Sequence, residues 1–405
     1  MKKSIYLDYN STSPVNEDIL KKMLPIFTEI YGNPSNENHA HGEQARTIIS
    51  EARKQVAKLV NMSPLDVIFT SGATEANNLA LQGMTSPSDI PLILVGATEH
   101  KSILEVADAL HNNKTAIVKK IPVASDGIID PSVLHEMLKG VKGRILVSIM
   151  AANSETGTLQ YIGEIPDIVH SYGGLVHCDA TQSVCHKKFD NELYGLDMIS
   201  LSSHKIYGPK GAGSLIATRE VRKMLHPILY GGGQEDNLRS GTLNVPSIVG
   251  FGMACEMAYN EIVLSEMLGD GITYQKKLRD YLEKRLLSLL PDTRINGSTS
   301  SRIPNTTNIH FAGADADAVM SNMPNLSVSS GSACTSSTME PSHVLTAMGM
   351  TFEEANQSIR FSLGRSTTKE EIDQAIDMVV NAVEFVRDME GYIEKAEIRG
   401  IKHAN

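Results

Sequence analysis

Short, β-rich apolar runs alternate with helix-period segments through the middle of the chain, and this alternation constrains the fold more than any other feature of the sequence. Residues 43–60, EQARTIISEARKQVAKLV, place their apolar side chains on one helical face. Strands that alternate with helices predict an α/β fold whose sheet is mostly parallel and covered on both faces. The runs that predict strands are VIFT (67–70), PLILVGA (91–97), RILVSIM (144–150), GLVHCDA (174–180), DMISLSS (197–203) and GSLIAT (213–218).

The last third of the chain has a different pattern. A long helical pattern runs from about Val245 to about Leu290, and a turn-rich stretch then leads into a strand ending in TTNIHF. A further helix is expected over 369–389, with Thr367 and Thr368 as candidate caps. We therefore expect a large α/β domain over residues 14–260 and a smaller α+β domain formed by residues 1–13 and 261–405.

Composition excludes several classes of function. The net charge of −10, without a Lys/Arg block, argues against direct nucleic-acid binding. No signal-peptide run follows MKKSIYLDYN, and the weakly polar window Val245–Cys255 is too short to span a bilayer. The four cysteines show neither a CxxC pair nor the spacing of a secreted scaffold. These features predict a cytoplasmic protein with no membrane partner.

Polar residues follow the predicted strands, where the carboxyl ends of parallel strands bind ligands. Gly72, Ala73 and Thr74 open a helix after the first run, and a helix N-terminus suits a phosphate. His100 follows the second run and Asn153 the third. Each of these signals is weak alone, because turns and lone histidines are usually structural.

Two later strand ends carry charged residues that are harder to explain structurally. Asp179 ends the fourth run, where a buried carboxylate is costly without a cationic partner. Lys205 ends the fifth, where desolvation would lower its pKa and make it a usable amine. A Schiff-base lysine, an acid for the pyridine nitrogen and a phosphate cradle are the parts of a pyridoxal 5′-phosphate (PLP) site. The coincidence of all three on one sheet edge predicts PLP binding.

The stretch SVSSGSACTSSTMEP (327–341) places Cys334 among small polar residues. Buried cysteines behave as small hydrophobes, so this one is not placed for packing. An exposed polar setting suits a reactive thiolate. Cys178, Cys185 and Cys255 are interpreted as structural. His39 and His41 lack the companions that a metal site would need, so no metal is expected.

Five motifs together resemble the group I cysteine desulfurases of the nitrogen-fixation and iron–sulfur-cluster type, within the class V aminotransferase branch of fold-type I PLP enzymes. The resemblance covers the chain from Ile5 to about Arg365 and implies a homodimer. The motifs are DATQ (179–182), SSHKIYGPKG (202–211), GGGQE (231–235), RSGT (239–242) and SSGSAC (329–334).

The resemblance implies a role for each matching residue. Lys205 forms the Schiff base with the cofactor and takes the α-proton of the substrate, and Asp179 pairs with the pyridine nitrogen. Arg360 clamps the substrate carboxylate, Asn153 contacts the cofactor and helps to orient the substrate, and Cys334 is the nucleophile. The remaining implied cofactor contacts are His100, stacked on the ring and able to move protons, Gln182 at the phenolic oxygen, Ala73, Thr74, Ser203 and His204 around the phosphate, and Thr242 reaching the other subunit's cofactor.

The activity implied is conversion of L-cysteine to L-alanine, with a persulfide formed on Cys334 and passed to an acceptor protein. Three alternatives stay open from the residues: a selenocysteine lyase, another class V aminotransferase-like enzyme, or a non-catalytic sulfur-relay subunit. The chain also departs from the family where ERGxR usually precedes SGT. It reads Glu235-Asp236-Asn237-Leu238-Arg239, which loses a cation and a glycine next to the expected cross-subunit contact.

Overall fold

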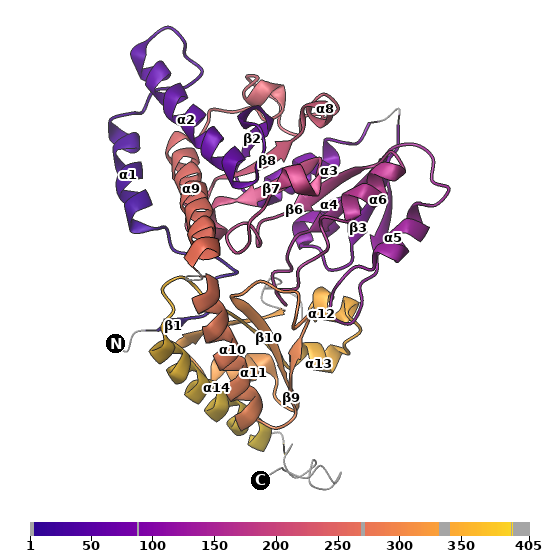
Figure 1. Ribbon diagram of the computed structural model, residues 1–405, viewed down its shortest axis with the longest axis vertical. Helices are drawn as coiled ribbons and strands as arrows, with labels where there is room; N and C mark the ends of the chain where they lie inside the picture. Colours follow the sequence, from indigo (N-terminus) through magenta and orange to yellow (C-terminus); the bar gives the residue numbers. More distant parts are fainter. Residues whose placement is uncertain (1–3, 87–88, 269–271, 332–340, 390, 392–405) are drawn as a thin grey trace.

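The computed structural model describes residues 4–86, 89–268, 272–331, 341–389 and 391. Its ribbon shows an α/β part that contains the N-terminal two thirds of the chain and, beneath it, a smaller α+β part that contains both β1 and the C-terminal helices (Figure 1). The predicted α/β fold is confirmed. The exact domain boundaries, 14–260 against 1–13 with 261–405, stay a prediction.

A seven-stranded sheet forms the centre of the larger part. All six strands predicted from the apolar runs are present, and only β8 runs antiparallel to its two neighbours. The sequence pattern did not reveal β4, because this edge strand carries lysines and is largely exposed. In spatial order the strands are β2 (Val67–Thr70), β8 (Gly213–Ala217), β7 (Met198–Ser202), β6 (Leu175–Asp179), β5 (Ile145–Met150), β3 (Leu92–Gly96) and β4 (Ile117–Ile121).

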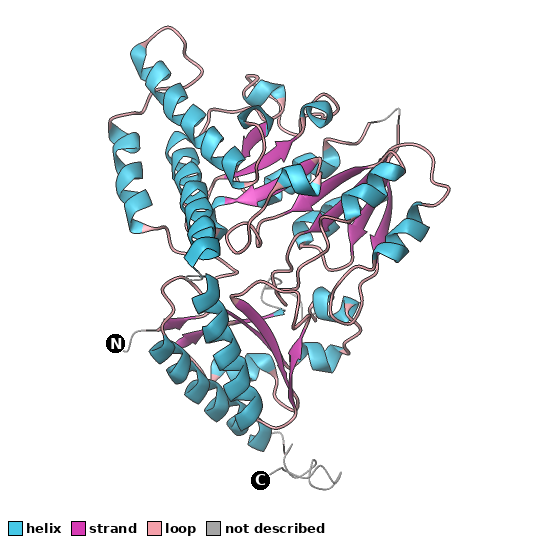
Figure 2. Cartoon of the chain, viewed as in Figure 1, coloured by secondary structure: helices cyan, strands magenta, loops and turns pink. Residues whose placement is uncertain are grey.

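Helices cover both faces of this sheet, as the predicted topology requires (Figure 2). Successive strand residues face opposite cores: Ile93 belongs to a core with residues of α3 and α4, and Leu94 to a core that includes residues of α2, α5, α6 and α9. The helix predicted over 43–60 is α2. The helices of this part are α1 (Glu17–Thr28), α2 (Ala40–Leu59), α3 (Ala73–Gln82), α4 (Lys101–Asn112), α5 (Pro131–Leu138), α6 (Ile165–Ser171), α7 (Asn191–Tyr194), α8 (Arg219–Arg222) and α9 (Val245–Leu268).

The smaller part has a four-stranded antiparallel sheet in the order β12 (Ser329–Ser330), β13 (Ser358–Ser362), β10 (Thr306–Phe311) and β9 (Thr293–Asn296). A parallel pair, β1 (Ile5–Tyr6) with β11 (Leu326–Ser327), brings the N-terminal segment into the same part. The helices are α10 (Ile272–Leu289), α11 (Ala316–Ser321), α12 (His343–Ala347), α13 (Phe352–Asn356) and α14 (Lys369–Met389).

The helical pattern from Val245 to Leu290 is helical over α9 and over α10, on either side of residues 269–271, which lie outside the described residues. The helix expected over 369–389 is α14, and Thr368 forms reciprocal hydrogen bonds with Glu371 at its start. Among the residues that the structure describes, no helix combines the length and the apolar character needed to cross a membrane.

Candidate active site

The carboxyl edge of the central sheet brings the predicted charged residues together. Strands β6 and β7 are parallel neighbours, and Asp179 at the end of β6 is the register partner of Ser200 in β7. A short 3₁₀ turn, Ser203–Lys205, follows β7 and carries Lys205. The charges of Asp179 and Lys205 both influence the pKa of His100, so the three side chains share one site.

Asp179 is buried and accepts two hydrogen bonds. Its Oδ2 atom accepts from Asn77 Nδ2 at 2.8 Å, and its Oδ1 atom accepts from the Thr181 backbone N–H at 3.0 Å. The same Asn77 amide donates to Ser102 Oγ at 2.8 Å. The two donors fix the orientation of the carboxylate, so it can serve as a hydrogen-bond partner for a protonated nitrogen.

His100 forms the N-cap of α4. Its Nδ1 atom accepts from the Ser102 backbone N–H at 3.1 Å and lies 2.8 Å from Ser102 Oγ. Desolvation lowers the pKa of His100, and Lys205 adds to this effect, while Asp179 opposes it. The imidazole is therefore neutral at pH 7, and the backbone donor to Nδ1 assigns its proton to Nε2. Any proton exchange by His100 with a ligand would use Nε2.

Lys205 and Gln182 meet at the backbone of the N-terminal segment. The Asn10 carbonyl oxygen accepts from both Lys205 Nζ and Gln182 Nε2, and Lys205 Nζ also donates to the Ser11 carbonyl at 2.8 Å. No sequence motif indicated this role of Asn10 and Ser11. These contacts join residues almost two hundred positions apart, and no local pattern reports such pairs.

The predicted phosphate cradle lies at the start of α3. Gly72 is the N-cap residue, and Ala73 and Thr74 begin the helix, as predicted. A Cβ placed on Gly72 would meet only Ser202 Oγ, at 3.9 Å, so the space before the helix is open. The backbone N–H groups at this N-terminus can therefore reach an anion.

The serines after β7 differ in their surroundings. Ser203 is fully buried, and its Oγ faces Gly208, where an added Cβ would lie 2.2 Å away. The neighbouring Ser202 Oγ is the side-chain atom that faces the Gly72 turn. The predicted phosphate contact of Ser203 stays a prediction, and the geometry adds Ser202 as a second candidate. Because side chains alternate between the two faces of a strand, the sequence could have suggested that Ser202 and Ser203 point in different directions.

His204 is held by the N-terminal segment as well. Its Nδ1 atom lies 3.1 Å from Thr12 Oγ1, and its carbonyl oxygen accepts from Ser13 Oγ at 2.8 Å. Burial, with Lys205 and Lys210 nearby, lowers the pKa of His204 to about 4. A neutral imidazole whose Nδ1 is engaged by a hydroxyl can still offer its Nε2 atom to a ligand.

Arg360 belongs to the smaller α+β part of the molecule, and Asn153 belongs to the larger α/β part. Arg360, on β13, donates from Nη2 to Asp8 Oδ1 at 2.6 Å and to Ser11 Oγ at 2.8 Å, and from Nη1 to the Ser154 carbonyl. Asn153 lies in the loop after β5. Its Oδ1 atom accepts backbone hydrogen bonds within that loop, and its Nδ2 atom donates to the Thr98 carbonyl. The amide of Asn153 thus already stabilises the loop, and its predicted role toward the substrate stays a prediction.

Cys334 lies outside the described residues, as does the rest of 332–340. The other three cysteines are placed as predicted for structural residues: Cys178 is buried in β6 and Cys255 in α9, and Cys185 is half-buried. Burial raises the pKa of all three thiols, that of Cys185 to about 12. Since the thiolate is the nucleophile, these three are poor candidates for catalysis.

The segment that departs from the family pattern, residues 235–239, has an unusual backbone conformation and an ion pair with Arg222. Glu235, Asp236 and Asn237 all have positive φ, and Asn237, at φ 66°, stands where a glycine is favoured. The side chain of Asp236 pairs with Arg222 at 2.6 Å. Asparagine and aspartate tolerate this conformation better than most residues, and Arg222 compensates the new negative charge. Thr242, at the end of the segment, is exposed.

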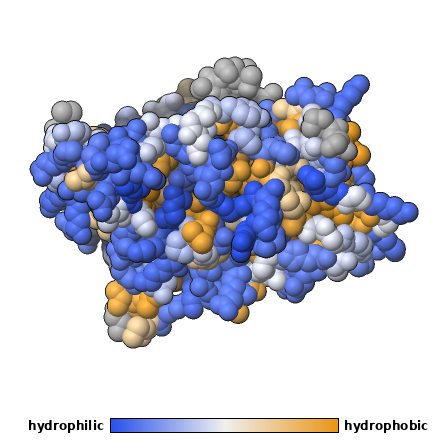
Figure 3. Space-filling view, turned by 90° about the horizontal axis from the view of Figure 1, so that it is seen from above, coloured by the Kyte–Doolittle hydropathy of each residue, from blue (hydrophilic) through white to orange (hydrophobic). Residues whose placement is uncertain are grey.

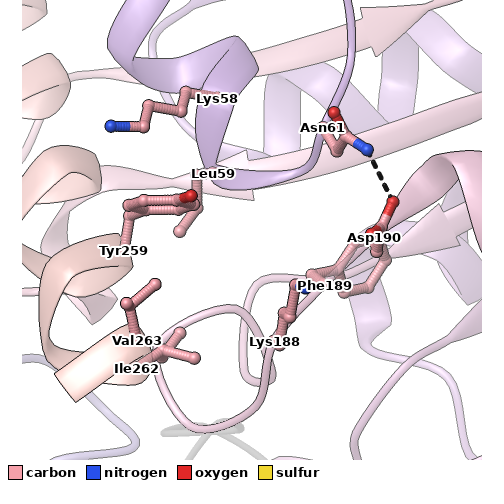
Figure 4. A pocket seen from close by; sticks show the side chains of 9 residues that line it. All are labelled: Lys58, Leu59, Asn61, Lys188, Phe189, Asp190, Tyr259, Ile262 and Val263. Carbon is pink, nitrogen blue, oxygen red and sulfur yellow. Dashed lines mark hydrogen bonds between the residues drawn. The ribbon is translucent and has the colours of Figure 1, made fainter. Parts of the chain in front are cut away.

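A cavity of about 210 Å³ lies elsewhere, between the C-terminal end of α2, α9 and residues 188–190 (Figure 4). Lys58 lies over the Tyr259 ring on one side of it, and Asn61 donates to Asp190 on the other. None of the predicted site residues that the structure describes lines this cavity. It is therefore separate from the sheet-edge site.

The residues at the sheet edge fit PLP. They provide an amine at Lys205, a hydrogen-bonded carboxylate at Asp179 and an open helix N-terminus at Gly72. Several buried oxygen atoms around them have no hydrogen-bond partner among the residues that the structure describes, namely Ser203 Oγ, Thr181 Oγ1 and Asn77 Oδ1. A polar ligand would give such atoms partners.

Three comparisons with known proteins show the family of the chain. The family model described as aminotransferase class-V matches residues 5–375. The chain is 43% identical to a cysteine desulfurase IscS from Anaeromyxobacter sp. (strain Fw109-5), over 96% of this chain and 95% of that protein. It resembles the solved structure of a NifS-like protein with a TM-score of 0.85 and 33% identity, covering 94% of this chain and 100% of that one. It also resembles a structure of SspA in complex with cysteine, with a TM-score of 0.77 and 30% identity, covering 90% and 100% of the two chains.

Proposed function

The chain belongs to the aminotransferase class-V family, has its fold-type I architecture and is a cysteine desulfurase, and from this premise we propose how its own residues perform the reaction. Lys205, Asp179 and the N-terminus of α3 bind pyridoxal 5′-phosphate. L-cysteine is the substrate, its carboxylate binds Arg360, and Cys334 receives its sulfur. A homodimer transfers the persulfide sulfur to an acceptor protein.

The cofactor contacts follow from the donor set. Asp179, held in place by hydrogen bonds from Asn77 and Thr181, pairs with the pyridine nitrogen. The backbone at Ala73 and Thr74, with Ser202 or Ser203 and the Nε2 atom of His204, binds the phosphate, and Gln182 contacts the phenolic oxygen. When bound, PLP supplies a sink for the electrons released at the α-carbon of the substrate.

Lys205 moves the proton in this proposal. Its Nζ atom hydrogen-bonds the carbonyl oxygens of Asn10 and Ser11, which fix the amine at the sheet edge. From that position the neutral amine takes the α-proton as a general base. His100, neutral and protonated at Nε2, can exchange a second proton at the same site.

Cys334 provides the nucleophile. Its thiolate attacks the sulfur of L-cysteine, the carbon–sulfur bond of the substrate breaks, and the β-carbon gains a proton. The overall change converts L-cysteine and the Cys334 thiol into L-alanine and a Cys334 persulfide, which balances atoms and electrons without an external redox reagent. The raised pKa values of Cys178, Cys185 and Cys255 support Cys334 as the acceptor.

Dimerisation is supported by an apolar stripe on α1. Ile19, Met23 and Ile26 bury one face of this helix, whereas Leu20, Leu24 and Phe27 are 45–58% exposed on another. The face of the molecule in Figure 3 is mostly hydrophilic, with separate hydrophobic patches. A row of exposed apolar side chains such as that on α1 favours contact with a second protein chain.

The single observation that carries the proposal is the juxtaposition of Asp179, Lys205 and His100 at one sheet edge. The purified holoenzyme is incubated with L-cysteine and a reductant, and alanine and sulfide are measured. Wild type is expected to yield both products in equal amounts, and Lys205→Ala and Cys334→Ala neither. Full turnover by Cys334→Ala would overturn the assignment of Cys334 and favour a class V activity that needs no thiol.

A further inference from the structure

The two ends of the segment that carries Cys334 contact each other. Gly331 precedes residues 332–340, and Pro341 and Ser342 follow them. A Cβ placed on Gly331 would lie 2.3 Å from Ser342 Cβ and 2.9 Å from Glu155 Oε2. Gly331, Ser342 and Glu155 therefore form a tightly packed neck at which the chain enters and leaves this segment.

Within the neck, Glu155 is hydrogen-bonded to Ser342. Ser342 Oγ donates to Glu155 Oε2 at 2.5 Å, a length typical of a hydroxyl bound to a carboxylate. Ser342 also caps α12 by accepting from the Leu345 backbone N–H. Burial raises the pKa of Glu155, while the hydrogen bond from Ser342 and the charges of His343, Arg360 and Lys101 oppose this effect. Glu155 is half-buried, and its hydrogen bond with Ser342 holds the carboxylate against the neck.

The neck is tied to the loops that carry two proposed site residues. The Glu155 backbone N–H donates to Asn153 Oδ1 at 2.9 Å, so Glu155 and Asn153 stabilise the same loop after β5. The residue after Ser342, His343, donates from Nε2 to the Glu99 carbonyl at 2.8 Å, next to His100. The C-terminal end of the segment is thus joined to the edge of the central sheet at two points.

We propose that Glu155 is a positioning residue for Cys334: it holds the neck formed with Gly331 and Ser342, and so fixes where the thiol can meet the substrate sulfur. The inference rests on the proposed function of Cys334 as sulfur acceptor. Glu155 acts through Ser342 and Gly331 and takes no part in the proton transfers at Lys205.

The test separates the two halves of the reaction in the holoenzyme. Exchange of the α-proton of L-alanine with D₂O depends on Lys205 and Arg360 but needs no thiol. Persulfide formed on Cys334 in one turnover with L-cysteine, measured by mass spectrometry, needs the thiol in place. Small displacements of reacting groups cost rates of ten- to a hundredfold, so Glu155→Ala should slow persulfide formation by about tenfold or more and leave exchange unchanged.

Two variants and one control complete the design. Glu155→Gln keeps an acceptor for Ser342 and should recover much of the lost rate. Gly331→Ala should reproduce the loss through the clash at the neck. The matched control is Glu354→Ala, which removes a carboxylate that accepts from Thr351 at the start of α13 and should change neither rate.

Unchanged persulfide formation in both Glu155→Ala and Gly331→Ala would overturn the inference. Equal losses of exchange and persulfide formation would also overturn it, because they indicate a role in the cofactor site and not in positioning the thiol. If Glu155→Ala does not fold, Glu155→Gln and Gly331→Ala decide. Wild-type enzyme that forms no persulfide on Cys334 would instead overturn the proposed function.

Discussion

Asp8 and Arg360 form an ion pair in which Oδ1 and Nη2 lie 2.6 Å apart, and both side chains are mostly buried. The same Asp8 oxygen accepts from Ser329 Oγ at 2.9 Å, and Ser329 is the register partner of Arg360 across β12 and β13. The arginine proposed to bind the substrate carboxylate therefore has a fixed carboxylate partner of its own. Asp8 orients the guanidinium and also contacts the strand that leads toward Cys334.

Replacing Asp8 should destabilise the protein and weaken substrate binding. Removing one member of a buried pair leaves the other charge uncompensated, so Asp8→Ala should lower the free energy of unfolding by about 3 kcal/mol, and Asp8→Asn by less. The KM for cysteine should rise in Asp8→Ala, because Arg360 loses its orientation. Urea denaturation and steady-state kinetics measure the two effects.

The control is Glu51→Ala, which breaks an exposed pair with Lys54. Exposed pairs contribute about 1 kcal/mol or less, so this variant should unfold like wild type. An Asp8→Ala enzyme as stable as the control would contradict the role assigned to the buried pair.

Asn77 should be needed for tight cofactor binding. Its amide is the side-chain donor to Asp179 Oδ2, and hydrogen bonds to charged groups contribute roughly 1.5–3 kcal/mol. Asn77→Ala is therefore expected to raise the Kd for PLP about tenfold or more, as measured by titrating the cofactor-free enzyme and following visible absorbance. Gln82→Ala, at the other end of α3, is the control and should bind PLP normally. An unchanged Kd in Asn77→Ala would show that Asp179 does not depend on this donor.

The central sheet was predictable because its buried strands are nearly continuous apolar runs. The pattern also predicted α2 and α14, whose apolar residues repeat with helical period. It failed at β4, where lysines on an exposed edge hide the strand. Periodicity reports burial, and most side chains of this edge strand are not buried.

Some residues of the site were predictable from local sequence, and others were not. Asp179, Lys205 and the start of α3 follow strand ends, so local sequence places them at one edge of the sheet. The contacts of Asn10, Ser11 and Asp8 join the first residues of the chain to positions beyond 180, and only the folded chain reveals them. The sequence likewise offers no sign that Gly331 and Ser342 are in contact.

The α1 stripe gives a direct test of the proposed dimer. Leu24→Asp combined with Phe27→Asp places two charges on the exposed apolar face and leaves the buried face unchanged. If a second subunit covers this stripe, the double variant should elute as a monomer in size-exclusion chromatography with light scattering, while wild type elutes as a dimer. Leu193→Asp, which changes a 77% exposed leucine on α7, is the control and should leave the wild-type mass unchanged. A double variant that remains dimeric would place the interface elsewhere.

Stability should fall on acidification because several histidines are buried in the neutral form. His177 is the clearest case: it is fully buried between Ser148 and Ser200, and desolvation lowers its pKa to about 4. In the unfolded chain a histidine titrates near its ordinary value of about 6.5. Between these two pH values the unfolded state binds a proton that the folded state does not, so the folded state loses stability as the pH falls.

The expected slope for this one histidine is at most about 1.4 kcal/mol per pH unit, since one pKa unit corresponds to that free energy. Urea denaturation of wild type at pH 7.0, about 5.5 and about 4.5 measures the total slope, to which His186 and His204 also contribute. His177→Gln removes one titrating group and should be less stable than wild type at pH 7, but its stability should fall less steeply below pH 6.5. Equal slopes for the two proteins would mean that His177 binds its proton in the folded state as readily as in the unfolded chain.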